Sequence, residues 1–229
     1  MDTVPIETGT AVLLRRWAGA VCLVLFFPAL IGATLADPLD DSASQPAQLR
    51  QAAGHLGQLH LAFLLELLGA LLFLGASMAV VGAIRRRGAG WANGAGVVGA
   101  VGVVGLSLIS MAHVYLYALV ASGTADGDRV LAARDSVAGW VVPFFFAAPI
   151  AVVLLGVAAF RAGFARWPLL VVVGVFAVLE IVPTPVGELP ALVAGLVAFC
   201  WLATALWTAP GEVAGVQGPV RRDSTTVQA

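Results

Sequence analysis

The sequence contains no lysine and only two cysteines in 229 residues. Without lysine, the chain cannot form a Schiff base with retinal or pyridoxal phosphate, and it has no P-loop lysine to contact nucleotide phosphates. Cys22 and Cys200 lie far apart in apolar stretches and form no CxxC pair, so they favour packing over redox chemistry. The absence of lysine therefore excludes proteins that bind retinal or pyridoxal phosphate through a Schiff base, and it excludes P-loop nucleotide-binding proteins.

Charged residues of either sign are also scarce. They make up 11% of the chain, whereas a soluble domain carries about 25%. The net charge of −1 gives no electrostatic basis for binding nucleic acid. Hydrophobic residues account for 60% of the sequence, and the mean hydropathy is +0.98. We therefore expect an integral membrane protein whose main partner is the lipid bilayer.

Long apolar runs predict an all-α, polytopic membrane protein, a bundle of six transmembrane helices in one domain, residues 1–208. A helix needs about 20 apolar residues to cross the hydrocarbon layer. The predicted helices cover residues 11–36, 56–84, 95–121, 137–160, 167–182 and 189–207. Residues 209–229 are rich in glycine, proline and polar side chains, and we expect them to form a disordered cytoplasmic tail.

The arginines predict the orientation of this bundle. If the N-terminus is cytoplasmic, most arginines lie inside and few outside, as the positive-inside rule requires. The inner arginines are then Arg15, Arg16, Arg85, Arg86, Arg87, Arg161, Arg166, Arg221 and Arg222, and the outer ones are Arg50, Arg129 and Arg134. Tryptophans fall near the predicted helix ends, as in an interfacial aromatic belt. We therefore expect a multi-pass plasma-membrane protein with both termini in the cytoplasm.

The first apolar run follows Arg15 and Arg16, which is also typical of a signal peptide. Its apolar core is longer than the usual 7–15 residues of a signal-peptide core. The pattern therefore favours a retained helix. Cleavage after Ala36 would instead leave five helices and an outside N-terminus.

Polar side chains inside the apolar runs are the candidate site, because ionisable groups are costly within a membrane. A rise of about 1.5 Å per residue places Glu66 and His113 at a similar depth in the outer part of the membrane. Ser110, His113 and Tyr117 share one helix face, and Glu66 shares a face with small residues. The candidate ligand-binding residues are Glu66, Ser110, His113, Tyr117 and Glu180.

These residues fit three functions. The first is non-enzymatic binding, or passage, of a small or lipid-like molecule through a polar pocket in the outer half of the bundle. The second is a membrane-embedded enzyme that uses Glu66 and His113 as an acid–base pair. The third is an accessory subunit of a membrane complex whose polar groups serve only to pack helices. We expect the non-enzymatic function, and we assign no catalytic residue.

No cofactor or metal site is predicted. The histidines form no metal-spaced cluster such as HxxxH. Haem between His60 and His113 is disfavoured, because their estimated depths differ by about 8 Å. The helix 95–121 instead carries a glycine-rich face that includes Gly96 and Gly99, and this face predicts close contact with a neighbour and a possible seam between identical chains.

Several short motifs run through most of the chain: the Arg15-Arg16 pair, the stretch 64–68 that leads to the arginines at 85–87, and the hairpin 160–167. Together they resemble a family of six-helix bacterial membrane proteins that is catalogued as a domain of unknown function. The resemblance implies the six-helix fold and implies no activity. The lack of lysine and the abundance of alanine, valine, glycine and arginine also suggest a GC-rich bacterial genome.

Overall fold

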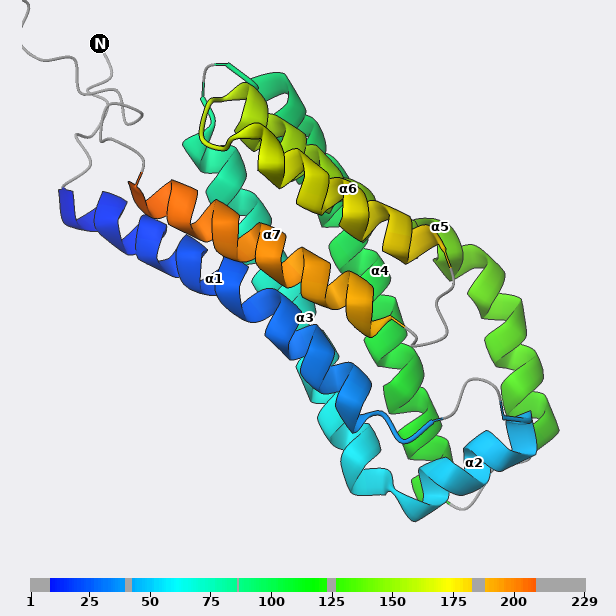
Figure 1. The fold of residues 1–229 in the computed structure, drawn as a ribbon. Coiled ribbons are helices and arrows are strands. Elements are labelled where there is room, and N and C mark those ends of the chain that lie inside the picture. Colours follow the sequence, from blue (N-terminus) through cyan, green and yellow to red (C-terminus); the bar gives the residue numbers. More distant parts are fainter. Residues whose placement is uncertain (1–8, 40–42, 86, 123–126, 183–187, 209–229) are drawn as a thin grey trace, which may run out of the picture.

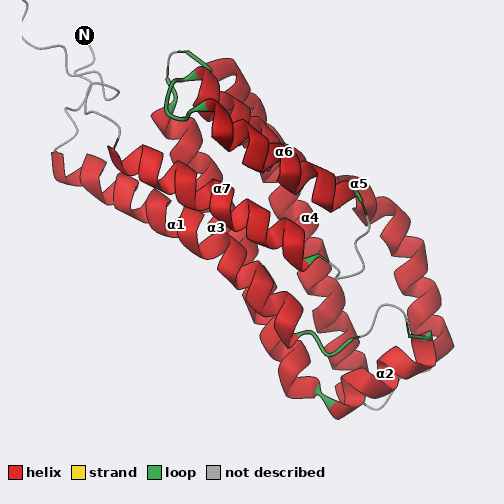
Figure 2. Cartoon of the chain, in the orientation of Figure 1, coloured by secondary structure: helices red, strands yellow, loops and turns green. Residues whose placement is uncertain are grey.

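The computed structural model describes residues 9–39, 43–85, 87–122, 127–182 and 188–208. These residues form the helices α1 (Gly9–Ala36), α2 (Gln45–Gly54), α3 (Leu56–Ala83), α4 (Ala89–Ala121), α5 (Gly127–Arg161), α6 (Trp167–Ile181) and α7 (Leu189–Thr208). Within the described ranges the chain contains no β-strand (Figure 2). The fold is therefore all-α, as expected.

All of the described helices except α2 form a closed ring. Helix α1 packs against α3, α3 against α4, α4 against α5, α5 against α6, α6 against α7, and α7 against α1. Neighbours in the ring run antiparallel, so the start of α1 and the end of α7 lie side by side at one end (Figure 1). There the rings of Trp17 and Trp207 meet edge to face, with centroids 6.2 Å apart. We call this the tryptophan end, because Trp91 and Trp167 also lie in the first turns of α4 and α6.

Among the described residues, four helices are long and apolar enough to cross a membrane, which indicates a membrane protein. These are Leu13–Ala36, Leu56–Ala83, Ala89–Leu108 and Leu189–Thr208. The apolar parts of α5 and α6 found among the described residues, Phe146–Arg161 and Trp167–Ile181, are shorter. Large apolar side chains such as Leu71, Val97 and Ile150 are more than half exposed on the outside of the ring. Such an apolar exterior is suited to lipid.

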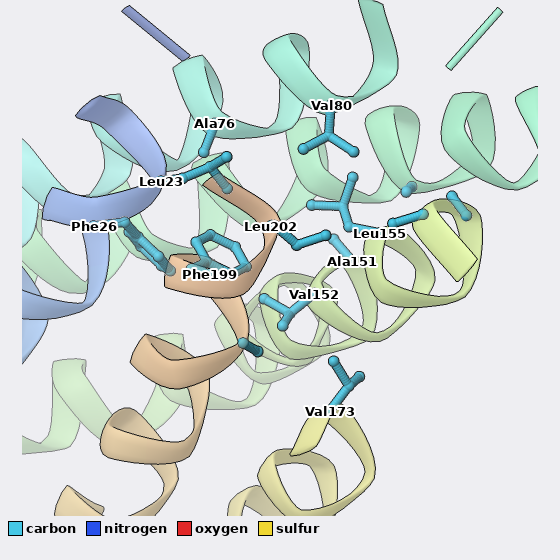
Figure 3. Close-up of a cluster of buried hydrophobic side chains, with 14 of the residues drawn as sticks. Leu23, Phe26, Ala76, Val80, Ala151, Val152, Leu155, Val173, Phe199 and Leu202 are labelled. Carbon is cyan, nitrogen blue, oxygen red and sulfur yellow. The ribbon is translucent and has the colours of Figure 1, made fainter. Parts of the chain in front are cut away.

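Aromatic rings fill the middle of the bundle. The buried ring of Phe27 in α1 lies 5.8 Å from that of Phe176 in α6 and 4.9 Å from that of Phe199 in α7. Helix α3 also contributes to this aromatic core, because the ring centroid of Phe73 in α3 lies 4.9 Å from that of Phe26 in α1. Figure 3 shows the core continuing through aliphatic side chains such as Leu155. Because lipid is as apolar as these side chains, close van der Waals packing holds the helices together.

Glycines let the helices approach closely. A Cβ atom on Gly102 of α4 would lie 2.7 Å from the backbone nitrogen and Cα of Ala148 in α5. Added Cβ atoms on Gly96 and Gly99 would come within 3.2 Å of α3 side chains. The predicted close contact of this glycine-rich face is confirmed, and its neighbours lie within the same chain. A seam between identical chains stays a prediction and would have to use other positions, such as Gly94.

Some helices differ from the predicted ranges. Helix α4 begins at Ala89 rather than residue 95, directly after Gly88, whose φ of 86° is favourable only for glycine. Helix α5 begins at Gly127 rather than residue 137. Helix α2 was not predicted, and it packs against α3, α4 and α5 at the end of the bundle opposite the tryptophan end (Figure 1). We call this the α2 end. The predicted tail, 209–229, lies outside the described residues.

The ring is less complete toward the α2 end. Helix α6 has 15 residues and α7 has 20, against 33 in α4 and 35 in α5. On the side toward α2, helix α6 ends and helix α7 begins before the level of α2, and α5 changes direction near the end of α6 (Figure 1). Pro143 and Pro149 lie within α5 and explain this bend, since proline removes a helical hydrogen bond.

Candidate functional site

The contact between α3 and α4 sets the level of the predicted site residues. Two contacts give the register: a Cβ on Gly99 would lie 3.2 Å from the Ser77 hydroxyl, and the rings of His60 and Tyr117 are 5.6 Å apart. Because α3 and α4 run antiparallel, moving the same number of residues along each helix from a contact reaches the same level on both. From either contact, this count places Glu66 level with Ser110 or with the residue next to it. The helices therefore bring these two predicted residues to the same depth.

Glu66 lies at the edge of a buried stripe of small residues. Ala62, Gly69, Ala70 and Ser77 on the same face of α3 are all buried, while Glu66 is half-buried. The predicted orientation of this stripe into the bundle is confirmed. The carboxylate thus lies at the boundary between the helix contact and the exterior.

Ser110 is the most deeply buried of the predicted residues whose side chains the structure describes, with an exposed fraction of 1%. Its hydroxyl donates to the backbone carbonyl of Leu106 at 3.0 Å. Ser107, one turn earlier, makes the same kind of bond to Val103 at 2.8 Å. Bonds of this type satisfy a hydroxyl within its own helix, which leaves its oxygen as a remaining acceptor.

His113 belongs to α4, but its side chain lies outside the described part of the structure. From the register, its backbone is less than one helical turn beyond the level of Glu66, a rise of about 4 Å. The pairing of Glu66 with His113 therefore stays a prediction. Tyr117, one turn further on, is partly exposed and its ring lies beside that of His60.

Glu180 lies on another part of the ring. It is half-buried in the last turn of α6, and α6 packs against α5 and α7. Glu180 thus comes from the side of the bundle opposite α3, at the end where α6 stops. Among the described residues, no group of three histidine, cysteine, aspartate or glutamate side chains could hold a metal ion.

A groove at the tryptophan end was not predicted. It has a volume of about 360 Å³ and is lined by Arg87, Gly88, Trp91, Phe160 and Arg161. The arginine pattern of the sequence predicts only the orientation of the helices and gives no sign of this groove. The two sides of the groove come from the start of α4 and the end of α5, so only the packing of these helices brings them together.

Comparisons of the chain with protein-family models, with curated proteins and with solved structures find no match. The resemblance to a six-helix bacterial family stays a prediction.

Proposed function

We propose that the chain is a six-span protein of the plasma membrane, with both termini in the cytoplasm. It binds, or passes, a small or lipid-like molecule at a polar cluster in the outer half. Glu66 and Ser110 form the centre of this cluster, His113 and Tyr117 extend it along α4, and Glu180 approaches from α6. No catalytic step and no cofactor is part of the proposal.

One observation carries the binding proposal. The register between α3 and α4 brings the carboxylate of Glu66 to the level of buried Ser110, with the His60–Tyr117 contact further toward the α2 end. Polar groups on two adjacent helices at one depth could bind the polar part of a ligand while the surrounding apolar surfaces contact the remainder. The shorter α6 and α7 support an opening toward the α2 end, because fewer helices surround that level.

The six-span topology has separate support. An even number of antiparallel helices in a closed ring returns the chain to the end where it began. At the tryptophan end the structure describes Arg15, Arg16, Arg85, Arg87, Arg161 and Arg166, against Arg50, Arg129 and Arg134 toward the α2 end, where Asp37 and Glu188 also lie. This distribution favours a cytoplasmic tryptophan end.

Native mass spectrometry of the protein released from mild detergent tests the binding proposal. We expect the wild type to retain one additional mass in a fixed ratio, and Glu66→Gln to lose most of it. Asp37→Asn is the matched control, since it also replaces a carboxylate by its amide, keeps an oxygen that can accept from the Leu39 N–H and lies outside the polar cluster, so it should retain the ligand. Equal retention by all three proteins, or only a heterogeneous mixture of lipids, would contradict the proposal.

A purely structural function in an accessory subunit is the second candidate. The bonds from Ser107 and Ser110 to their own helix favour it, because such serines need no ligand. In that case Glu66→Gln and Ser110→Ala would alter stability without removing any bound mass.

A further inference from the structure

The groove at the tryptophan end brings two arginines together. Gly88 makes this possible, because a Cβ there would lie 2.8 Å from the carbonyl oxygen of Ala158 and 3.2 Å from the Cβ of Arg161. The start of α4 is therefore pressed directly against the last turn of α5. Arg87 precedes this contact and Arg161 belongs to it, so both side chains line the same groove of about 360 Å³.

This positive charge has no acidic neighbour in the described part of the chain. Neither Arg87 nor Arg161 forms an ion pair with a described residue, whereas Arg85 donates from its Nε to the Gly82 carbonyl at 3.1 Å. The acidic residues that the structure describes all lie toward the α2 end: Asp37, Glu66, Asp128, Asp135, Glu180 and Glu188. The amino-terminal end of α4 adds partial positive charge, and the carboxyl-terminal end of α5 offsets part of that of Arg161. The groove is therefore suited to an anion.

The other walls of the groove indicate where this anion comes from. Trp91 is 46% exposed and Phe160 is 39% exposed, although both are large and aromatic. They lie at the same end as Trp17, Trp167 and Trp207, where a belt of tryptophans is typical of the level of lipid headgroups. A ligand here would meet guanidinium groups on one side and apolar rings on the other.

We propose that this groove binds the phosphate of an anionic phospholipid, with Arg87 and Arg161 on the phosphate and Trp91 and Phe160 against the adjoining glycerol and acyl chains. Two planar guanidinium groups can each form paired hydrogen bonds with phosphate oxygens. The site is distinct from the polar cluster around Glu66 and lies at the opposite end of the bundle. Its occupation would join α4 to α5 through the lipid.

Titration of the purified full chain in mild detergent, followed by native mass spectrometry, tests this site. The probes are phosphatidylglycerol, phosphatidylcholine and the soluble compound glycerol 3-phosphate. We expect the first phosphatidylglycerol to bind at least tenfold more tightly than phosphatidylcholine. Arg87→Gln and Arg161→Gln should each weaken it about tenfold, whereas Arg85→Gln, which removes an arginine outside the groove, should change it less than twofold. Arg87→Lys should retain part of the affinity, because it preserves the charge.

Two results would overturn the proposal. The first is that phosphatidylglycerol and phosphatidylcholine bind with equal affinity and that no substitution in the groove changes this affinity. The second is displacement of phosphatidylglycerol by an equal concentration of glycerol 3-phosphate, which would identify a soluble phosphate compound as the ligand. The thermal stability of each variant without added lipid provides the folding control. A variant that unfolds would be replaced by the Lys substitution at the same position.

Discussion

The two halves of the bundle are built differently. From the middle to the tryptophan end, all six ring helices contribute to a continuous apolar core of aromatic and aliphatic side chains. The α2 end lies beyond the end of α6 and the start of α7, and the buried residues described there include Gln48 and Ser110 beside apolar side chains such as Leu59. The first half has the extended apolar contacts that stabilise a fold, with Ser77 as a buried polar side chain, whereas the second half contains the buried polar side chains of Gln48 and Ser110, which bond to backbone carbonyls. We therefore place the fold's stability in the first half and the proposed ligand in the second.

The largest effect is expected in the aromatic core. Phe27→Ala should destabilise the bundle by about 3–5 kcal/mol, because the ring has an exposed fraction of 1% and contacts other aromatic rings from α6 and α7. The free energy of unfolding in mixed detergent micelles measures this loss. Phe144→Ala, at a ring that is 40% exposed, is the control and should cost less than about 1 kcal/mol. Equal losses would contradict the proposed difference between core and exterior.

A smaller effect is expected where helices touch through glycine. Gly102→Ala should cost about 1–3 kcal/mol, since its Cβ would press on the rigid backbone of Ala148. Gly94→Ala on the same helix has no atom within 4 Å of the new Cβ, and should be neutral or slightly stabilising. The same unfolding measurement compares the two variants. A neutral Gly102→Ala would show that α4 and α5 are not in close contact.

Apolar patterning predicts much of this fold and misses particular features for physical reasons. The predicted ends at Ala36, Leu56, Trp167 and Leu189 coincide with helix ends in the structure. The predicted start of α5 lies too late, because hydropathy marks the apolar part of a helix and residues 127–136 include four charged side chains. The predicted start of α4 lies too late because two glycines and Asn93 weaken the apolar signal of its first turns. Helix α2 has no apolar run, and its only local signal is Pro46 in the first turn after Ser44.

The candidate site was predictable only in part. Helical periodicity correctly orients the small-residue stripe beside Glu66, since residues three and four apart share a face. The order of helices around the ring depends on contacts between distant segments, so the sequence did not place Glu180 opposite α3. The same limitation concealed the groove, because Arg87 and Arg161 are neighbours only after α4 packs on α5.

A modest contribution is expected from the tryptophan pair. The rings of Trp17 and Trp207 meet edge to face at 6.2 Å and join the first and last helices. A double-mutant cycle with Trp17→Leu and Trp207→Leu should give a coupling of about 0.5–1.5 kcal/mol. Additive losses would show that the two ends of the ring are not joined there.

The smallest effect is expected at Ser77. Its Oγ is buried, and it forms no hydrogen bond in the part of the chain that the structure describes. Ser77→Ala should therefore be neutral or stabilise the protein by up to about 1 kcal/mol, because it removes an unsatisfied hydroxyl. A loss of more than about 1 kcal/mol in the unfolding measurement would instead indicate that this hydroxyl has a partner in the membrane.

Labelling of single introduced cysteines on intact cells tests the central claim, that the tryptophan end and the α2 end face opposite sides of the membrane. Ala53→Cys lies exposed in α2, and Thr208→Cys lies exposed at the end of α7. The wild type is the control, because its own cysteines are partly buried within α1 and α7. A membrane-impermeant maleimide should label Ala53→Cys directly and Thr208→Cys only after the cells are permeabilised. Labelling of both variants, or of Thr208→Cys alone, on intact cells would contradict the proposed topology.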